Sequence, residues 1–501
     1  MIQTMVDRFR SRFLERYFVP TLMVAALGAV TISLMIGLQQ SVWFDEANTV
    51  LLAKQPSLSL MHLTSVDAHP PLYYLLLKTW AGIFGWSELA LRSFSVVALG
   101  GAVILGGLLV RRMFGVRAAL MTLPFVALSP LLLRYGFEIR MYSLAMLIGI
   151  AATYALVAAL ETKAKNRQWK LYVIYALLLA LGIYTHYFMA LLLAVHLVWL
   201  TWRAYREKQR VVKTPWFVAV VGAVVLFLPW VPALISRLGD SAQTTTAQPM
   251  TVESLVGIGS FAFLYQPAWQ LGGYGTILLA VIAITLCAFI VRAFKKASKK
   301  ERDYLWLLAC YVLVPVVLIA LVSLIQPMYV ERYASLFVMG GLLLVGVAVA
   351  YSARKLSSLA GLATVVMYVV LLLGVAQLAK VGNTNYQQLQ KPAVKEAVAA
   401  LMPCDHSSTI LAADPYVAIE LSYYLPSCEV RFYSNKDKLK GGYAALSESP
   451  LRIAQPETEL ANSTKLYYVY YGKPRLTMPH NLSEIKHETY GTLSVDTFET
   501  E

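Results

Sequence analysis

The sequence predicts a polytopic α-helical membrane protein of about 11 transmembrane helices, followed by a small α/β domain, and three observations support this class. Hydrophobic residues make up 58% of the 501 residues, charged residues make up only 14%, and the mean hydropathy is +0.60. Apolar runs long enough to cross a bilayer recur up to residue 379. The remaining segment carries half of the acidic residues of the chain. This composition excludes an ordinary soluble protein.

Basic residues are distributed unevenly between the apolar runs. Up to residue 379, 24 Lys and Arg residues fall in six short clusters and 7 lie elsewhere. The clusters are 8–16, 111–117, 163–170, 203–213, 292–302 and 354–355. Because basic loops stay in the cytoplasm, this asymmetry predicts a cytoplasmic N-terminus. The same scatter over separate loops argues against a nucleic-acid partner, despite the net charge of +15.

Alternation of apolar runs and loops gives the predicted spans. They are expected at 18–40, 90–110, 118–133, 141–160, 171–185, 187–202, 215–235, 272–292, 304–325, 335–352 and 358–379. No small-residue cleavage site follows the first run, so we expect it to remain as a span. This count predicts a transmembrane domain of residues 1–379 and a soluble extracytoplasmic domain of residues 380–501.

The C-terminal segment has the pattern of an α/β domain. Runs rich in β-formers at 408–413, 429–433 and 465–471 alternate with helical patterns at 391–402 and 415–424. Cys404 and Cys428 lie in this segment, where an extracytoplasmic location would allow a disulfide between them. Cys287 and Cys310 fall within apolar spans, and we expect both to be buried as small hydrophobic residues.

Two adjacent acids, Asp45 and Glu46, directly follow the first predicted span. They begin the first outside loop, 41–89, in which 57–64 and 72–86 have amphipathic helical patterns. Ionisable groups at the edge of a membrane are functional candidates, whereas the simplest alternative is that the pair caps the next helix. A structured loop of this kind could cover a cavity.

The same loop contains Asp67 and His69, and two prolines follow at a predicted helix start. Proline suits the first turn of a helix, so His69 is expected at the positive end of that helix. With Asp67 nearby, His69 could be a metal ligand, an acid or base, or a group that binds the acceptor. The alternative is a histidine that only hydrogen-bonds the loop.

The second outside turn, 134–142, is rich in charge. On a helix, Arg134, Glu138 and Tyr142 would share one face at a spacing of four residues, with Arg140 pointing elsewhere. A local ion pair is the simpler interpretation, but an exposed pair stabilises little. The sequence therefore favours a functional role for Glu138, Arg140 and Tyr142.

Later outside turns add further candidates. Arg332 and Tyr333 begin a span on the side that is poor in basic residues, and guanidinium pairs bidentately with phosphate oxygens. Arg332 is thus a candidate for binding a membrane-anchored phosphate. His186 lies in a turn between two spans, and Arg237 precedes a hydrophilic segment at 239–254.

These motifs, taken in order, resemble the GT-C fold glycosyltransferases of family 39 type, the bacterial relatives of protein O-mannosyltransferases and aminoarabinose transferase. The matching motifs are WFDEA at 43–47, HPPLYY at 69–74, Arg92, EIRMYSL at 138–144, THY at 185–187 and ERY at 331–333. The resemblance covers residues 18–350 and identifies little in the C-terminal domain.

The resemblance implies a fold and a reaction. A sugar would move, with inversion, from a polyprenyl-phosphate donor to an acceptor hydroxyl at the outer face of a bacterial cytoplasmic (inner) membrane. Asp45 matches the catalytic base of the family, and Glu46 is its neighbour in the same motif. Some relatives bind a metal at the motif that contains His69, so a divalent metal held by His69 and Asp67 stays open.

This chemistry agrees with the residues. A sugar phosphate carries its own leaving group, so the reaction needs a base for the acceptor and cations for the departing phosphate. Asp45 is expected to be the base. The residues expected to bind the phosphate are Arg140, Arg332 and Tyr333, with Arg92 and Arg237 as weaker candidates. The expected supporting residues are Asp67, His69, Glu138, Tyr142 and His186.

Two other functions compete with this interpretation. A transporter or flippase of a lipid-linked or acidic solute would show paired repeats and charges near the bilayer midplane, which the sequence lacks. A membrane-anchored binding or assembly protein would use its C-terminal domain instead. The acceptor, whether glycan, lipid or protein, and the sugar are not indicated by the sequence.

Overall fold

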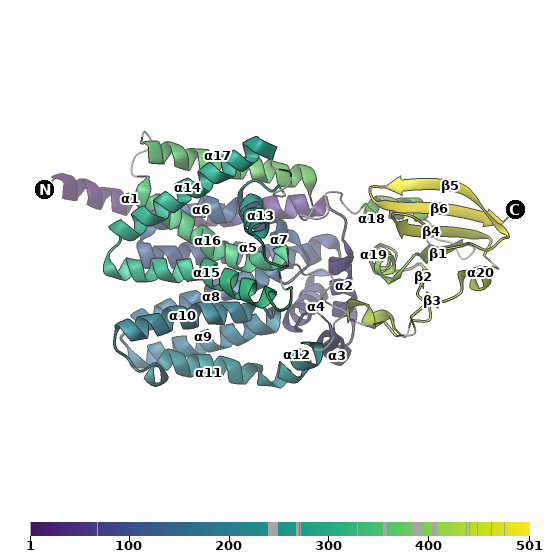
Figure 1. The fold of residues 1–501 in the computed structure, drawn as a ribbon, viewed down its shortest axis with the longest axis horizontal. Coiled ribbons are helices and arrows are strands. Elements are labelled where there is room, and N and C mark those ends of the chain that lie inside the picture. The colour runs from purple at the N-terminus through teal and green to yellow at the C-terminus, as the bar shows by residue number, and fades with distance from the viewer. Residues whose placement is uncertain are drawn as a thin grey trace.

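The computed structural model describes most of the chain. The described residues are 2–67, 69–238, 249–266, 270, 272–327, 329–353, 358–382, 393–402, 408–436, 438–439, 441–447, 449–461, 463–474 and 476–500. They form a bundle of helices with a separate sheet domain at one end (Figure 1).

The helical part contains long helices and a structured first loop. The long and intermediate helices are α1 (Ile2–Leu38), α5 (Glu88–Phe114), α6 (Val116–Ala127), α7 (Pro130–Phe137), α8 (Tyr142–Glu161), α9 (Lys165–Thr185), α10 (Met189–Arg206), α11 (Pro215–Phe227), α12 (Val231–Leu238), α13 (Val252–Phe263), α14 (Gly272–Lys296), α15 (Lys299–Ser323), α16 (Glu331–Ser352) and α17 (Leu359–Val381). The first loop folds into α2 (Phe44–Lys54), α3 (Ser57–Val66) and α4 (Leu72–Phe84), so the helices predicted there are present.

The chain is a multi-pass membrane protein. Among the described residues, nine helices are long and apolar enough to cross a membrane, or ten if α6 and α7 count as one span bent by 60°. The predicted span at 118–133 is therefore not one straight helix: α6 ends at Ala127 and α7 restarts at Pro130, whose ring suits a first turn. The predicted span at 187–202 corresponds to α10. This helix is less apolar than the nine, because Arg203 and Arg206 lie in its last turn.

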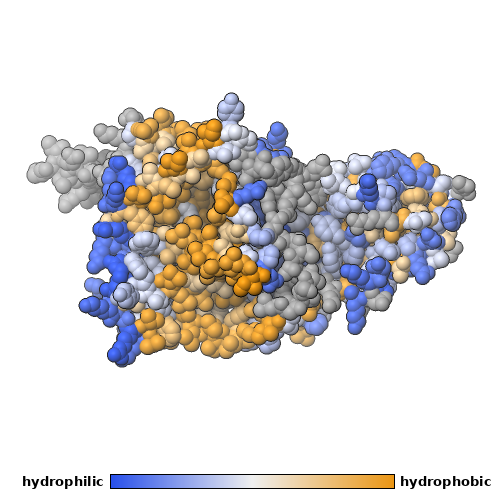
Figure 2. All heavy atoms as spheres, viewed as in Figure 1, coloured by the Kyte–Doolittle hydropathy of each residue, from blue (hydrophilic) through white to orange (hydrophobic). Residues whose placement is uncertain are grey.

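The surface of the helical part matches this assignment. Figure 2 shows a broad hydrophobic band over the bundle, bounded by hydrophilic residues at the end remote from the sheet domain. Cys310 is half-buried and Cys287 is exposed. The predicted burial of Cys287 is wrong, because α14 lies on the outside of the bundle and most of its apolar side chains face outward.

The C-terminal part is a six-stranded mixed sheet with short helices. Its elements are α18 (Val394–Leu401), β1 (Ser408–Ala412), α19 (Pro415–Tyr424), β2 (Val430–Tyr433), η5 (Gly441–Leu446), β3 (Arg452–Ile453), α20 (Pro456–Glu459), β4 (Lys465–Tyr471), β5 (Leu482–Tyr490) and β6 (Leu493–Thr500). The strand order is β3-β2-β1-β4-β6-β5. Strands β1 to β4 run parallel, while β6 pairs antiparallel with β4 and β5. Apolar clusters cover both faces of the sheet.

The sheet domain contacts the first loop directly. Helix α19 packs against α2. The Tyr424 hydroxyl donates to Glu88 Oε1 at 2.6 Å and accepts from the Val42 backbone N–H at 2.7 Å. Lys395 pairs with Glu88 at 3.0 Å. The two parts are therefore joined by polar contacts as well as by the chain.

The structure describes one cysteine of the predicted disulfide. Cys428 is disulfide-bonded, and Cys404, its predicted partner, lies outside the described residues. The Cys404–Cys428 pair stays a prediction.

Candidate active site

The site is built where α1 ends and α2 begins. Arg92 of α5 is fully buried and donates to the Gly37 carbonyl at 2.7 Å and the Gln40 carbonyl at 3.3 Å. These are carbonyls at the C-terminal end of α1, where a cation is favoured by the helix dipole. A Cβ on Gly37 would lie 2.6 Å from Phe137 Cβ, so this approach requires glycine. Arg92 thus fixes the direction in which the chain leaves α1.

Glu46 lies on the buried side of α2. Its Oε2 atom is 3.4 Å from Arg92 Nη2, and its Oε1 atom accepts from the Ile139 backbone N–H at 2.9 Å. Burial raises the pKa of Glu46 to about 6, against the opposing effect of the Arg92 charge. Glu46 therefore ties α2 to α5 and to the 138–141 turn, and it is fully buried.

Asp45 is the neighbouring acid and faces the other way. Its Oδ2 atom lies 3.7 Å from Arg332 Nη2, and the two side chains are 17% and 21% exposed. Its carbonyl accepts from Arg140 Nη1 at 3.2 Å. The pair is less buried than Glu46 and Arg92, although the Asp45 Oδ2 atom itself is buried.

Arg140 links two segments of the first loop, α2 and the turn that contains His69. In addition to the Asp45 carbonyl, its Nη1 atom donates to the Thr49 hydroxyl at 2.9 Å, and its Nη2 atom lies 3.2 Å from His69 Nδ1. Thr49 is four residues after Asp45 in α2, and its hydroxyl donates back to the Asp45 carbonyl at 2.7 Å. The backbone position of Asp45 is therefore held from two sides.

Aromatic rings and imidazoles form one wall of the site. The ring of His186 lies 5.1 Å from that of His69 and 4.6 Å from that of Tyr333. Tyr142 lies 6.1 Å from His186, and its buried hydroxyl has no hydrogen-bond partner among the described residues. The structure thus brings together residues from four separate loops that the sequence placed on one side.

The remaining supporting residues lie at the edges of this group. Glu138 Oε1 is 3.0 Å from Arg134 Nη1 and accepts from the Trp43 indole at 2.9 Å. Asp67 Oδ2 accepts from the Tyr74 hydroxyl at 3.3 Å. The predicted helix face through Arg134, Glu138 and Tyr142 is wrong, because α7 ends at Phe137 and α8 starts at Tyr142.

An apolar groove lies within the helical part. It lies among α13, α14, α15 and α16 and has a volume of about 530 Å³. Its lining is almost wholly apolar and includes Tyr329 and Val330, which shortly precede Arg332 in the chain. The groove suits a long hydrocarbon chain.

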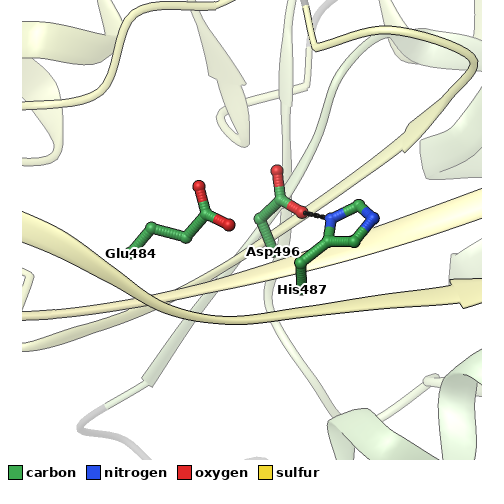
Figure 3. Close-up of side chains that lie close together, drawn as sticks. All are labelled: Glu484, His487 and Asp496. Atoms are coloured by element: carbon green, nitrogen blue, oxygen red, sulfur yellow. Dashed lines mark hydrogen bonds and ion pairs between the residues drawn. The ribbon is translucent and has the colours of Figure 1, made fainter.

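One group of residues in the described part of the chain has the spacing of a metal site, and it lies in the sheet domain. Glu484 and His487 of β5 and Asp496 of β6 face one another, with His487 Nδ1 and Asp496 Oδ1 2.5 Å apart (Figure 3). A bulge between Glu484 and Lys486 brings Glu484 onto the face of His487. His69 and Asp67 are not in this group, and a metal at those two residues stays a prediction.

Some relevant residues were not identified from the sequence. Thr49 could have been found by its helical spacing from Asp45. Glu420 of α19, described below, is a lone acid in an otherwise apolar helix, which is a signal for a special environment. The side chain of Arg237, a weaker phosphate-binding candidate, lies outside the described residues.

Comparison with known proteins identifies the fold and a family match over part of the chain. Residues 68–233 match the family described as dolichyl-phosphate-mannose-protein mannosyltransferase. The fold is similar to ArnT from Cupriavidus metallidurans in the apo state, with a TM-score of 0.62, 12% identity, and coverage of 96% of this chain and 98% of that chain. The chain therefore shares the fold of ArnT, and residues 68–233 are similar to this mannosyltransferase family.

Two further solved structures share the fold. ArnT from Cupriavidus metallidurans bound to undecaprenyl phosphate matches with a TM-score of 0.59, 13% identity, and coverage of 96% of this chain and 97% of that chain. The oligosaccharyltransferase of Archaeoglobus fulgidus in the apo form matches with a TM-score of 0.53, 13% identity, and coverage of 92% and 70%. No curated protein sequence is significantly similar to the chain.

Proposed function

We propose that this protein is an inverting glycosyltransferase that moves a sugar from a polyprenyl-phosphate donor to an acceptor hydroxyl, with Asp45 as the general base. The observation that carries the proposal is the convergence of one partly exposed carboxylate and two guanidinium groups, one of which closely follows residues that line an apolar groove. Asp45 Oδ2 lies 3.7 Å from Arg332 Nη2, and Arg140 holds the Asp45 backbone. A carboxylate beside cations suits the needs of this reaction.

The donor fits the groove and the cations. The prenyl chain would occupy the apolar groove, and its phosphate would reach Arg332 beside Tyr329 and Val330. Arg140 and Tyr333 complete the phosphate site, since guanidinium groups bind phosphate oxygens bidentately. Solved structures with this fold include ArnT bound to undecaprenyl phosphate and an archaeal oligosaccharyltransferase in complex with a dolichol-phosphate, which supports a lipid phosphate as the ligand here.

The transfer step follows from these positions. The acceptor hydroxyl oxygen attacks the anomeric carbon and forms a new C–O bond, while the bond from that carbon to the phosphate oxygen breaks. The electron pair leaves on polyprenyl phosphate, whose negative charge is stabilised by Arg332 and Arg140. Asp45 takes the hydroxyl proton. Attack opposite the leaving phosphate inverts the anomeric centre.

Neighbouring residues have different roles in this proposal. Glu46 and Arg92 are fully buried, so they hold α2 and the end of α1 rather than contact the donor. Tyr142, His186 and His69 form the wall beside Arg332, and Glu138 and Asp67 orient Trp43 and Tyr74. A divalent metal, if one binds, would be held by His69 and Asp67.

The surface supports a specific orientation in the membrane. The connections α10–α11 and α14–α15, which carry basic clusters, lie at the end of the bundle remote from the sheet domain (Figures 1 and 2). Because basic loops stay in the cytoplasm, the site and the sheet domain would face outward. We therefore place the enzyme in a bacterial cytoplasmic membrane, with a cytoplasmic N-terminus and a glycan, lipid or protein acceptor outside.

Release of the lipid product tests the proposal. Purified protein in nanodiscs is incubated with a panel of undecaprenyl-phosphate sugars and envelope acceptor fractions, and free undecaprenyl phosphate is measured. Wild-type protein should release it with one of these donors. Asp45→Asn should slow release at least ~100-fold, because general base catalysis contributes about that much. Binding of undecaprenyl phosphate alone should be unchanged.

Two results would contradict the assignment. Full activity of Asp45→Asn would remove the assigned base. Movement of the labelled lipid across sealed vesicles, without release of undecaprenyl phosphate under any condition, would instead indicate the transporter alternative.

A further inference from the structure

The outer side of α2 is covered by the sheet domain. The Phe44 ring, next to Asp45, stacks on Tyr416 of α19 with centroids 4.3 Å apart and an interplanar angle of 8°. Tyr443 of η5 lies 5.4 Å from the same ring. A Cβ added to Gly442 would lie 3.3 Å from Asn48 Nδ2, so η5 also approaches the next turn of α2 closely. Helix α2, which carries Asp45, is therefore held between Arg92 on one side and the sheet domain on the other.

A buried acid of the sheet domain lies at this contact. Glu420 of α19 is fully buried, and its Oε2 atom accepts from the Tyr471 hydroxyl at 2.7 Å. Its Oε1 atom is buried and has no hydrogen-bond partner among the described residues. Glu420 lies one turn after Tyr416 in α19, and both side chains contact Tyr471. The carboxyl group therefore lies beside the α2 turn on which Tyr416 stacks, close enough for the Phe44 backbone amide to affect its pKa.

The position of Phe44 explains why an acid stands there. Phe44 is the first residue of α2, and the N-cap Trp43 supplies no side-chain oxygen to the first turn. The first N–H groups of a helix lack partners within the helix and carry partial positive charge. A carboxyl group from another domain can satisfy that end of the helix, as a capping side chain would.

We propose that Glu420 is a positioning residue that holds the first turn of α2, and with it Asp45, in the orientation needed for proton transfer. The sheet domain is then part of the active site. The effect of Glu420 on the position of α2 rests on the contacts above. Its effect on sugar transfer rests on the proposed function.

The environment of Glu420 favours the neutral, protonated form of its carboxyl group. Burial raises its pKa to about 8, and the nearby acids Asp414 and Asp45 act in the same direction. Around it lie Tyr471 of β4, Tyr416 of α19 and Tyr443 of η5. A neutral carboxyl group has almost the same shape as the glutamine amide, so Glu420→Gln should preserve the contact at neutral pH.

Hydrogen exchange of the α2 amides tests control of the helix without any enzyme assay. In the full-length protein, Glu420→Ala should make amides in the first turns of α2 exchange at least tenfold faster, while those of α5 stay unchanged. Glu420→Gln should exchange like wild type at pH 7. Tyr468→Phe is the matched control, because Tyr468 is buried on the opposite face of β4 from Tyr471. Unchanged exchange of α2 in Glu420→Ala would overturn the proposal.

Transfer kinetics test the catalytic consequence. Glu420→Ala should lower kcat at least ~10-fold with an unchanged KM for the lipid donor, because misplacing a reacting group affects the chemical step. Glu420→Gln and Tyr468→Phe should keep wild-type kcat. Faster α2 exchange together with unchanged kcat would overturn the link to catalysis. If the wild type transfers no sugar at all, the proposed function fails, and the exchange experiment still decides whether Glu420 controls α2.

Discussion

The guanidinium group of Arg332 lies 3.7 Å from the carboxylate of Asp45, which joins the start of α16 to the start of α2. Both side chains are partly exposed, whereas the adjacent pair of Glu46 and Arg92 is fully buried. Two neighbouring acids on one helix turn therefore have different environments and should respond differently to substitution. The proposed function assigns the accessible pair to chemistry and the buried pair to structure.

Arg332→Ala should raise the KM for an undecaprenyl-phosphate sugar at least tenfold. The guanidinium group would be lost from the end of the groove, where the donor phosphate is proposed to bind. Arg332→Lys should give an intermediate value, because an ammonium is a point charge without the planar fork. Lys54→Ala is the control, since Lys54 lies over Trp86 in the first loop. Steady-state kinetics measure the effect, and an unchanged KM in Arg332→Ala would separate this residue from the phosphate.

Glu46→Gln should destabilise the protein by about 3–5 kcal/mol, because it leaves Arg92 buried without its paired charge. Asp45→Asn should change stability far less, since Asp45 is partly exposed and Arg332 remains accessible to water. Thermal unfolding of the two variants in the same detergent compares them directly. Equal shifts in Tm would contradict the structural role of Glu46.

Glu420 should make stability depend on pH. Its pKa is about 8 in the folded protein and near 4.5 in an unfolded chain, so the folded state keeps a proton that the unfolded state releases. Stability contributed by this group is therefore greatest below pH 4.5 and falls as pH rises to about 8, by up to about 1.4 kcal/mol per pH unit.

Comparison of variants isolates this dependence. Between pH 6 and 8, wild-type protein should lose more Tm than Glu420→Gln, which cannot titrate at this position. The window begins at pH 6 because Glu46, whose pKa is also raised to about 6, contributes below it. Parallel Tm curves for the two proteins would rule out titration of Glu420 in this range.

The sequence predicted the fold class because its signals are local. Apolar runs give the spans, and runs of β-formers give β1, β2 and β4 at the expected places. The bend between α6 and α7 was missed although Ser129 and Pro130 mark a helix start, because the surrounding residues are apolar without interruption. Hydropathy describes the environment of a segment but says little about its direction.

The site was predicted as a set of residues on one side, without their partners. Asp45, Arg140 and Arg332 were candidates because charges at a membrane interface are costly. The sequence could not predict which of Asp45 and Glu46 is buried. Neighbouring residues on a helix point about 100° apart, and only the packing of α5 decides which one faces inward. Glu420 was missed because its contact with α2 joins segments from opposite ends of the chain.

The contact between α2 and α19 joins a segment made early in biosynthesis to one made near its end. While the ribosome is still translating the membrane spans, Phe44 has neither Tyr416 nor Tyr443 to pack against. A chain cut short by a premature stop codon would insert its helices yet leave this aromatic ring uncovered. Phe44 is therefore covered only after the whole polypeptide has been made.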